Sequence, residues 1–139
     1  MSEGTVSMDP AVSIIIPVYN EFRTFDLVLE RVRRAQLPQG CEKEIVVIDD
    51  GSTDGTTQVL GRHEQAGIVV GHHAERNAGK GTALRIGIQL ATGDVLLTQD
   101  GDLEYDPDDY ARLLDPIVRG EADVVYGSRF LGRPRKREP

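Results

Sequence analysis

The sequence has a single cysteine, no long apolar run and no excess of positive charge, and each absence excludes a class of protein. Cys41 cannot form an internal disulfide or a zinc cluster, and it fits a reducing, cytoplasmic setting. No apolar run approaches the roughly 18 to 20 residues that a membrane-spanning helix needs. The formal net charge of −7 lacks the basic character of a nucleic-acid-binding protein, so we expect no nucleic-acid partner. The 139 residues leave room for one domain.

The acidic charge is concentrated in the body of the chain. Residues 129–139 hold five basic side chains and one acid, which leaves 11 basic and 22 acidic side chains in residues 1–128. Seven of these acids fall within residues 94–109, a window without lysine or arginine. Clustered carboxylates repel one another unless solvent, a cation or a bound metal offsets their charge. The window is therefore a candidate ligand or metal site, and a solvated loop is the plain alternative.

Apolar runs alternate with helical patterns along the chain, which predicts an α/β fold with a mostly parallel sheet and helices on both faces. Most of the expected strands are continuous runs of Val, Ile and Leu, as in strands that helices cover on both faces. The expected strands are residues 12–16, 44–48, 68–70, 94–98 and 123–126. We expect a flexible N-terminus over residues 1–11, one domain over 12–132 and a basic tail over 133–139.

Four helices are expected between these strands, each with an apolar stripe at helical spacing. The last of them begins with Asp106 as N-cap and Pro107 at its first position. The stripes are interpreted as core rather than as cofactor sites. Their residues are Phe25, Val28, Leu29, Val32, Val59, Leu60, Ala66, Ala83, Ile86, Gly87, Leu90, Tyr110, Leu113, Leu114 and Ile117.

Polar segments follow four of the expected strands, at residues 17–21, 49–55, 99–104 and 127–129. In open α/β sheets, ligands bind beyond the carboxyl ends of the strands, so these segments are where chemistry is expected. Acids from two separate strands and one arginine, Arg129, should then converge on one rim of the sheet.

Asp100 and Asp102 form an Asp-x-Asp pair directly after an apolar strand, with Gly101 between them. Two carboxylates at this spacing can contact one hard divalent cation, and Mg²⁺ or Mn²⁺ usually keeps open positions for phosphate oxygens. The pair therefore suggests a diphosphate substrate held through a metal. A turn with solvated acids is the alternative.

Asp50 ends another apolar strand, where a short acid can accept hydrogen bonds from a ribose hydroxyl or a base N–H. Its neighbours have a plainer explanation. We expect two of the three residues Asp49, Ser52 and Asp54 merely to satisfy amides of the turn and of the following helix.

Residues 77–81, Asn-Ala-Gly-Lys-Gly, open the third expected helix. They form no Walker loop, because Gly81 stands where Ser or Thr is required, and no dinucleotide fingerprint, which needs Gly or Ala at Leu84. Lys80 could still lie near a phosphate. Close helix packing is expected to explain most of the small residues here, which are Gly79, Gly81, Ala83 and Gly87.

Together, these motifs resemble the nucleotide-diphospho-sugar glycosyltransferases of family 2, which have the Rossmann-like GT-A fold. The resemblance runs from Val12 to about Gly132 and rests on the order and spacing of six segments. These are residues 13–21 (SIIIPVYNE), 44–56 (EIVVIDDGSTDGT), 77–81 (NAGKG), 91–94 (ATGD), 99–107 (QDGDLEYDP) and 122–129 (ADVVYGSR). The last two look most like the branch that makes dolichyl-phosphate or polyprenyl-phosphate mannose or glucose.

The resemblance implies an inverting hexosyltransferase with a GDP-mannose-type or UDP-glucose-type donor, a polyprenyl or dolichyl phosphate acceptor, and Mg²⁺ or Mn²⁺. It implies catalytic roles for Asp102 and Arg129. The implied metal ligands are Asp100, Asp102 and Glu104, the last standing where some members have glutamine. The implied nucleotide-sugar contacts, to which the reasoning above adds Lys80, are Pro17, Tyr19, Glu21, Ile48, Asp50, Asp100, Gly101, Asp102 and Arg129.

The end of the chain departs from this family. Related transferases continue with a further strand and helices on the acceptor side, so we expect a C-terminally truncated domain that contains the donor half. The four basic residues among 133–139 could each contribute about 1 kcal/mol near an anionic leaflet, which is the basis for a hypothesis of peripheral contact with the cytoplasmic membrane face. Three other functions stay open: donor binding without turnover, a receiver-type phosphoacceptor domain, and a phosphatase with an Asp-x-Asp nucleophile.

Overall fold

The computed structural model describes residues 10–38, 40–101, 106–119 and 129–132. Its strands are β1 (Ala11–Val18), β2 (Glu42–Asp49), β3 (Val70–His73), β4 (Val95–Thr98) and β5 (Arg129–Gly132). Its helices are α1 (Phe25–Arg34), α2 (Thr56–Gln65), α3 (Lys80–Leu90) and α4 (Tyr110–Val118), and a 3₁₀ turn over Pro107–Asp109 precedes α4. Strands and helices alternate, which confirms the expected α/β class.

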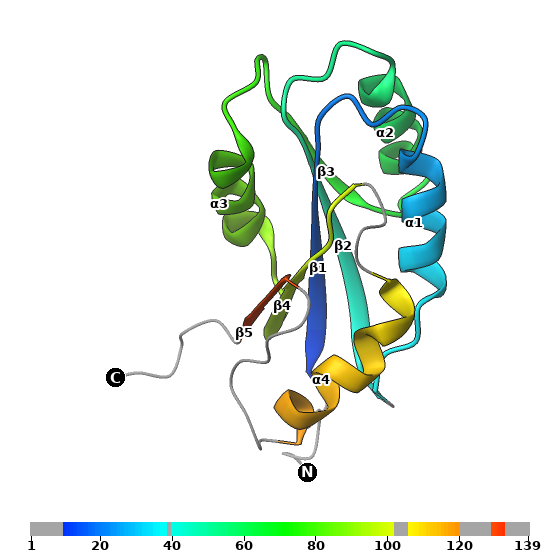
Figure 1. Ribbon diagram of the computed structural model, residues 1–139, viewed down its shortest axis with the longest axis vertical. Coiled ribbons are helices and arrows are strands. Elements are labelled where there is room, and N and C mark those ends of the chain that lie inside the picture. The colour runs from blue at the N-terminus through cyan, green and yellow to red at the C-terminus, as the bar shows by residue number, and fades with distance from the viewer. Residues whose placement is uncertain (1–9, 39, 102–105, 120–128, 133–139) are drawn as a thin grey trace.

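The strands form one sheet in the order β3-β2-β1-β4-β5. Strand β1 pairs in parallel with β2 and β4, β2 pairs in parallel with β3, and β5 runs antiparallel to β4. Helices α1, α2 and α4 cover one face of the sheet and α3 covers the other (Figure 1). The mostly parallel sheet with helices on both faces is thus confirmed.

Strand β1 shows why its sequence is apolar without alternation. Val12, Ile14 and Ile16 pack in one cluster with residues of α1, α2 and α4, whereas Ile15 packs on the opposite face with α3. All four side chains are fully buried. Because successive side chains of a strand point to opposite faces, a strand covered on both faces is apolar at most positions. The buried polar residue of β1, Ser13, donates a hydrogen bond to Glu44 Oε1 at 2.6 Å.

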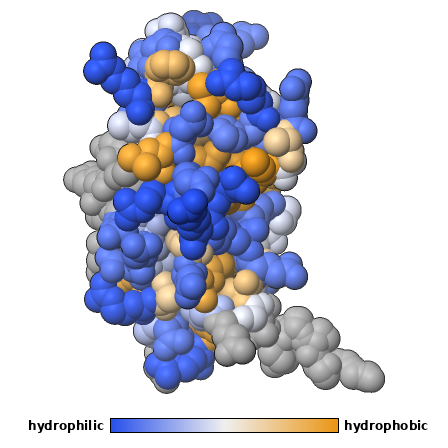
Figure 2. All heavy atoms as spheres, turned by 90° about the vertical axis from the view of Figure 1, so that its right-hand side faces the viewer, coloured by the Kyte–Doolittle hydropathy of each residue, from blue (hydrophilic) through white to orange (hydrophobic). Residues whose placement is uncertain are grey.

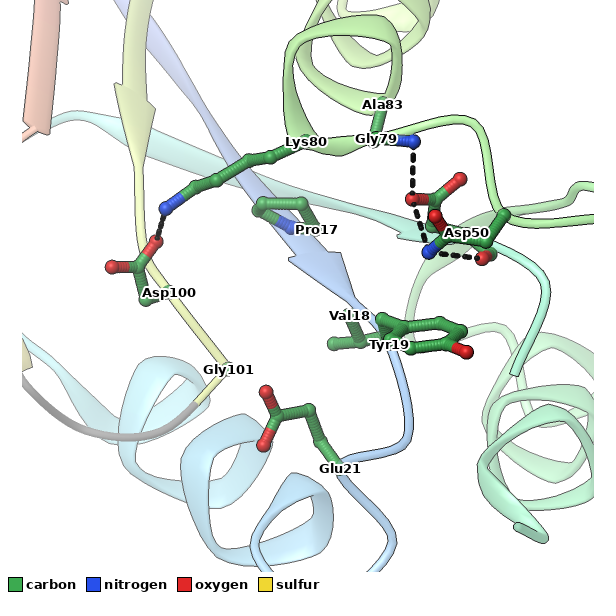
Figure 3. Close-up of a pocket in the computed structure, with 11 residues that line it drawn as sticks. Pro17, Val18, Tyr19, Glu21, Asp50, Gly79, Lys80, Ala83, Asp100 and Gly101 are labelled. Carbon is green, nitrogen blue, oxygen red and sulfur yellow. Dashed lines mark hydrogen bonds and ion pairs between the residues drawn. The ribbon is translucent and has the colours of Figure 1, made fainter. Parts of the chain in front are cut away.

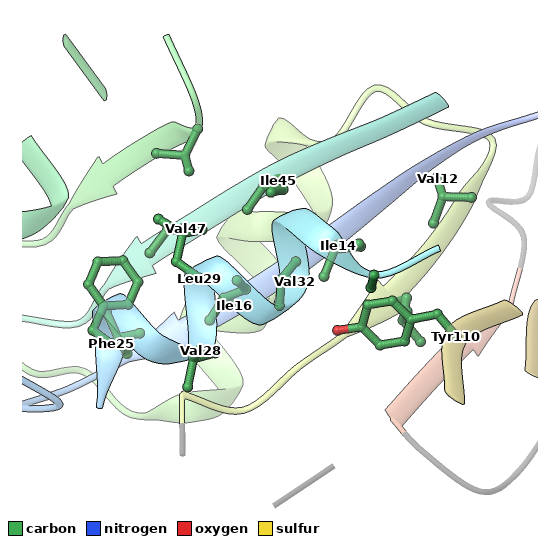
Figure 4. Packing of buried hydrophobic residues seen from close by; sticks show 14 of the residues in the cluster. Val12, Ile14, Ile16, Phe25, Val28, Leu29, Val32, Ile45, Val47 and Tyr110 are labelled. Atoms are coloured by element: carbon green, nitrogen blue, oxygen red, sulfur yellow. The ribbon is translucent and has the colours of Figure 1, made fainter. Parts of the chain in front are cut away.

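Helix α1 supplies much of the larger cluster. Phe25, Val28, Leu29 and Val32 lie at helical spacing and are at most 1% exposed. Figure 4 shows these side chains facing those of β1 and β2, with Tyr110 of α4 beside them. Burying one such side chain stabilises a fold by about 1.5–3 kcal/mol. The outer surface of this side of the molecule is mostly hydrophilic, with separate hydrophobic patches (Figure 2).

The second residue of β2, Lys43, caps the C-terminal end of α1. Its Nζ donates to the carbonyl oxygens of Val32 and Arg33 in the last turn and of Ala35 just after it, at 2.6–2.9 Å. The last carbonyls of a helix have no partner within the helix and carry partial negative charge, so a cation stabilises them. Asp106 accepts a hydrogen bond from Asp108 N at 3.0 Å and so acts as an N-cap, but of the 3₁₀ turn Pro107–Asp109 that precedes α4; the N-cap of α4 itself is Asp109.

Some expectations need correction. The strand expected at residues 68–70 begins only at Val70, because a hydrogen-bonded turn at the end of α2 continues through Ile68. Ala66 lies past the end of α2 and is exposed, and Leu90, the last residue of α3, is 37% exposed. The strand expected at residues 123–126 lies outside the described residues. Strand β5 was not expected.

The small residues around α3 have two different explanations. A Cβ on Gly87 would lie 2.4 Å from Ile15 Cγ2, so close packing of α3 on β1 requires glycine there. Ala83 is buried in the same interface. Gly79 and Gly81 instead face open space, and Gly79 has φ +103, a backbone conformation that favours glycine. The packing explanation therefore holds for Ala83 and Gly87 and is wrong for Gly79 and Gly81.

Within the described part of the chain, none of the helices has the length and apolar character needed to cross a membrane.

Candidate functional site

The strand order creates a topological switch between β1 and β4. From β1 the chain builds the sheet outward through β2 and β3, and it then returns to the other side of β1 as β4. Loops that leave neighbouring strands in opposite directions open a crevice beyond the carboxyl ends of those strands. A cavity of about 580 Å³ lies at this place, a size typical of small-molecule sites.

The cavity collects residues from four separate segments of the chain (Figure 3). The lining residues are Pro17, Val18, Tyr19, Glu21, Asp50, Asn77, Gly79, Lys80, Ala83, Asp100 and Gly101. Seven of them are site residues named from the sequence. Ile48 is not among them, because it is fully buried and packs beneath the cavity with Ala83.

The loop after β1 is tied to the loop after β2. Four hydrogen bonds of 2.7–3.1 Å join the two loops: Asn20 N to Ser52 Oγ, Thr53 N to Asn20 Oδ1, Glu21 N to Thr56 Oγ1, and Phe22 N to Asp54 Oδ2. These bonds fix the backbone on both sides of Tyr19 and Glu21. The two side chains that line the cavity therefore project from a rigid segment.

Three polar residues between the end of β2 and the start of α2 accept hydrogen bonds from backbone amides. Asp49 Oδ1 accepts from Ser52 N at 2.9 Å, Ser52 accepts from the β1 loop, and Asp54 accepts from the amide and hydroxyl of Thr56. All three residues, rather than two, thus have a structural role. The hydrogen bonds from Thr56, together with that from Phe22 N, lower the pKa of Asp54 below its usual value.

Asp50 uses its carboxylate to hold the loop that precedes α3. Oδ1 accepts from Ala78 N at 2.9 Å, and Oδ2 accepts from Gly79 N and from Asn77 Nδ2 at 3.0 Å each. Asp50 is only 5% exposed. A ribose hydroxyl or base N–H would have to share these oxygens with the loop.

An ion pair spans the cavity. Lys80 is the first residue of α3, and its Nζ lies 2.6 Å from Oδ1 of Asp100, which follows β4 (Figure 3). Asp100 is 8% exposed, so the pair lies partly away from water. The carboxylate that the sequence assigns to a metal therefore already faces a cation of the protein.

Gly101 brings the end of β4 close to the end of β1. A Cβ at this position would lie 3.1 Å from Val18 Cγ1 and 3.2 Å from Glu21 Cγ, so a larger residue would press on the cavity wall. Thr24 Oγ1 donates to the Gly101 carbonyl at 2.9 Å. This contact fixes the backbone at the middle residue of the Asp-x-Asp segment.

The remaining site residues are described in part or not at all. The register of β5 pairs Arg129 with Thr98, which places the Arg129 backbone beside the end of β4, two residues before Asp100. Asp102 and Glu104 lie outside the described residues. Among the residues that are described, no three His, Cys, Asp or Glu side chains gather as a metal site. The metal set named from the sequence stays a prediction.

Sequence reasoning did not assign Val18 or Asn77, which also line the cavity. Asn77 Nδ2 donates to both the carbonyl and the carboxylate of Asp50. Its place at the head of the Asn-Ala-Gly-Lys-Gly motif was the available signal, since asparagine often stabilises turns through its side chain.

Comparison with known protein sequences gives consistent matches. The sequence model described as "Glycosyl transferase family 2" matches residues 13–138. A dodecaprenyl-phosphate galacturonate synthase of Rhizobium johnstonii is 34% identical over 121 residues, which is 84% of this chain and 35% of the relative. An undecaprenyl-phosphate 4-deoxy-4-formamido-L-arabinose transferase of Aeromonas hydrophila is 38% identical over 120 residues, which is 82% of this chain and 35% of the relative. The chain thus spans about a third of the length of these relatives.

Solved structures with the GT-A fold are also similar. The crystal structure of S. aureus TarS 1-349 in complex with UDP-GlcNAc has a TM-score of 0.68 and 26% identity, over 82% of this chain and 33% of that one. The mannosyltransferase PcManGT from Pyrobaculum calidifontis, in complex with GDP-Man and Mn²⁺, has a TM-score of 0.64 and 29% identity, over 83% of this chain and 33% of that one. These matches confirm the expected fold.

Proposed function

Because this chain belongs to glycosyl transferase family 2, we propose that it supplies the nucleotide-sugar site of an enzyme that transfers a sugar to a polyprenyl phosphate. The observation that carries the proposal is the cavity at the topological switch, where Tyr19, Asp50 and Asp100 from three strand ends surround one space. The two relatives named for polyprenyl-phosphate products support the acceptor class. The UDP-GlcNAc and GDP-Man complexes of similar structures support the donor class.

The nucleoside end of the donor is proposed to lie beside the β1 loop, against Pro17, Tyr19 and Glu21. Tyr19 is 44% exposed, and its ring offers a flat surface on which a base can stack. Asp50 shapes the adjoining wall through the loop that it holds, and Ile48 supports the wall from the core through its packing with Ala83. The donor is proposed to be a hexose on GDP or UDP, of the GDP-mannose or UDP-glucose type, or a related uronic acid.

The diphosphate end is proposed to lie near Asp100 with Mg²⁺ or Mn²⁺. Asp100 fits such an ion because carboxylate oxygens are the ligands that these cations prefer and this carboxylate lies at the cavity wall. Asp102 and Glu104 are proposed to complete the ligand set. When bound, the ion would neutralise charge on the departing diphosphate. The Mn²⁺ in PcManGT and in GalNAc-T7 with UDP and GalNAc supports a divalent metal.

Transfer is proposed to proceed with inversion: the acceptor phosphate oxygen attacks the anomeric carbon in line, the bond from that carbon to the diphosphate oxygen breaks, and the nucleoside diphosphate leaves. A lipid phosphate is ionised near pH 7, so the site needs little help from a general base. Asp102 and Arg129 are the proposed catalytic residues. Arg129 would offset the negative charge that grows on the leaving group, and its backbone position beside the end of β4 supports this role.

The alternative of a receiver-type phosphoacceptor domain loses support from the strand order of the sheet. Receiver domains belong to the doubly wound order 2-1-3-4-5, whereas this sheet has the order β3-β2-β1-β4-β5. Donor binding without turnover remains the second candidate, because the chain spans only about a third of its curated relatives.

Isothermal titration with UDP-glucose, GDP-mannose and UDP-galacturonate, each with and without Mn²⁺, tests the proposed site. Metal-dependent binding of one of them supports it, and binding of none overturns it. Transfer of the sugar to undecaprenyl phosphate then separates an active transferase from a donor-binding domain. The peripheral membrane contact proposed for the basic residues 133–139 is tested by vesicle sedimentation. Equal sedimentation with and without these residues rejects it.

A further inference from the structure

The ion pair between Lys80 and Asp100 joins two walls of the cavity. The Lys80 Nζ to Asp100 Oδ1 distance is 2.6 Å, and the two side chains are 46% and 11% exposed. The ammonium therefore has access to solvent and to any ligand in the cavity, while the carboxylate is largely shielded. A charge pair of this kind is stronger than one between two solvated side chains.

The base of the Lys80 side chain is fixed. Asp50 accepts hydrogen bonds from Ala78 N and Gly79 N, and Gly79 turns the chain into α3 with φ +103. From this clamped point the four-carbon stem reaches across to Asp100 (Figure 3). Only the stem and the ammonium are free to move, because the backbone below them is held.

A divalent ion and the ammonium need the same carboxylate. Mg²⁺ binds carboxylate oxygens at about 2.0–2.1 Å, so an ion on Asp100 and an ammonium on the same oxygen would lie within about 5 Å of each other. Two cations this close repel, and a low-dielectric wall strengthens the repulsion. A metal that reaches Asp100 must therefore displace Lys80.

We propose that Lys80 is the counter-ion of Asp100 in the free protein and couples metal binding to diphosphate binding. A metal alone displaces the ammonium without offering it a new acceptor. A nucleoside diphosphate that enters with the metal supplies phosphate oxygens to which the ammonium can turn. Metal and diphosphate then increase each other's affinity by the same factor, as linkage requires. This inference rests on the proposed function, because the displaced lysine needs a diphosphate acceptor.

The test measures Mn²⁺ affinity of the 139-residue chain by electron paramagnetic resonance of free Mn²⁺, with no nucleotide and with UDP or GDP. In the Lys80→Met chain, Mn²⁺ alone should bind at least about fivefold more tightly than in the unmodified chain. The gain in Mn²⁺ affinity that the diphosphate brings should shrink by a similar factor. Lys80→Arg keeps the positive charge and should stay within about twofold of the unmodified chain.

Arg85→Met is the matched control, because it removes one positive charge from the same helix. Arg85 is exposed, and its Nη2 lies 3.4 Å from Thr82 Oγ1 on the same helix. Mn²⁺ affinity should change little in this variant. Equal changes in the Lys80→Met and Arg85→Met chains would overturn the inference, since they would indicate a general effect of charge.

The two proposals fail in different ways. If the unmodified chain binds no sugar nucleotide in the presence of Mn²⁺, the proposed function fails. If it binds one but Lys80→Met leaves the affinity for Mn²⁺ alone unchanged or weaker, only the coupling role of Lys80 fails. Melting curves establish that each variant is folded, and Lys80→Gln serves as a second neutral variant.

Discussion

Replacing Asp50 with asparagine separates a positioning role of this residue from a ligand-binding role. The side chain accepts three hydrogen bonds, from two backbone amides and the Asn77 side chain. Asparagine has only one acceptor oxygen. If that oxygen takes the place of Oδ2, the new NH₂ group faces Ala78 N–H and leaves one partly buried donor without its acceptor. We therefore expect Asp50→Asn to be destabilising without any nucleotide present.

The size of the effect follows from these contacts. A donor left unpaired costs about 1–3 kcal/mol, with the lower end for one that is only partly buried, and bonds to a charged acceptor are worth roughly twice those to a neutral one. Together these effects give a loss of about 1–3 kcal/mol in the free energy of unfolding. For a chain of this length, that lowers the melting temperature by up to roughly 10 °C. Urea unfolding followed by circular dichroism measures the free energy directly.

Asp94→Asn is the control for this prediction. Asp94 is exposed and accepts one hydrogen bond from Ala11 N at 3.1 Å, so its loss should cost about 1 kcal/mol or less. If Asp50→Asn is as stable as Asp94→Asn but no longer binds nucleotide, the clamp on the loop before α3 is unimportant. The reasoning from the hydrogen bonds would then be refuted.

Unfolding experiments on five further variants test other contacts of the fold. Gly87→Ala should cost about 1–3 kcal/mol through its clash with β1, whereas Gly81→Ala, in open space within a helix, should stabilise slightly. Lys43→Met should cost about 1–3 kcal/mol, because three carbonyls lose a charged donor. Burial, and then the charge of Asp106, raise the pKa of Tyr110. The stability that the neutral Tyr110 hydroxyl contributes is therefore present below about pH 10 and is lost as the pH rises further. Tyr110→Phe should reduce this loss of stability at alkaline pH. Because the pKa of Asp54 is lowered in the folded chain, its carboxylate contributes stability above about pH 4 that is lost as the pH falls. The Asp54→Asn chain should therefore be less stable than the unmodified chain at pH 7, and its stability should change less with acid.

The parts of the fold that sequence could predict are those where burial dictates residue type. The continuous apolar runs around Ile14 and Val46 predicted strands covered on both faces, and both strands are buried. Strand β3 was misplaced because it is an edge strand whose residues, Val70 to His73, are not buried. An edge strand has no strong apolar signal, since its pairing comes from the backbone.

The candidate site was predictable as a set of positions but not as a set of contacts. Strand ends and loop motifs pointed to Asp50, Lys80 and Asp100, because parallel strands bring their carboxyl ends to one edge. Which donor each carboxylate faces depends on how segments 20 to 29 residues apart approach one another. The sequence pattern carries no information on that approach, so the Lys80–Asp100 pair appeared only in three dimensions.

The position of β1 at the centre of the sheet has a consequence for how the protein folds. Its two neighbours pair with it at sequence separations of 31 residues for Ala11 with Glu42 and 83 residues for Val12 with Val95. Long-range pairing slows folding, because the chain entropy of closing these loops is lost before the contacts form. The walls of the cavity come from both pairings, so a partly folded chain holding only the β1–β2 pair would have no complete cavity. Ligand binding should therefore develop in the slowest kinetic phase of refolding, together with the docking of β4.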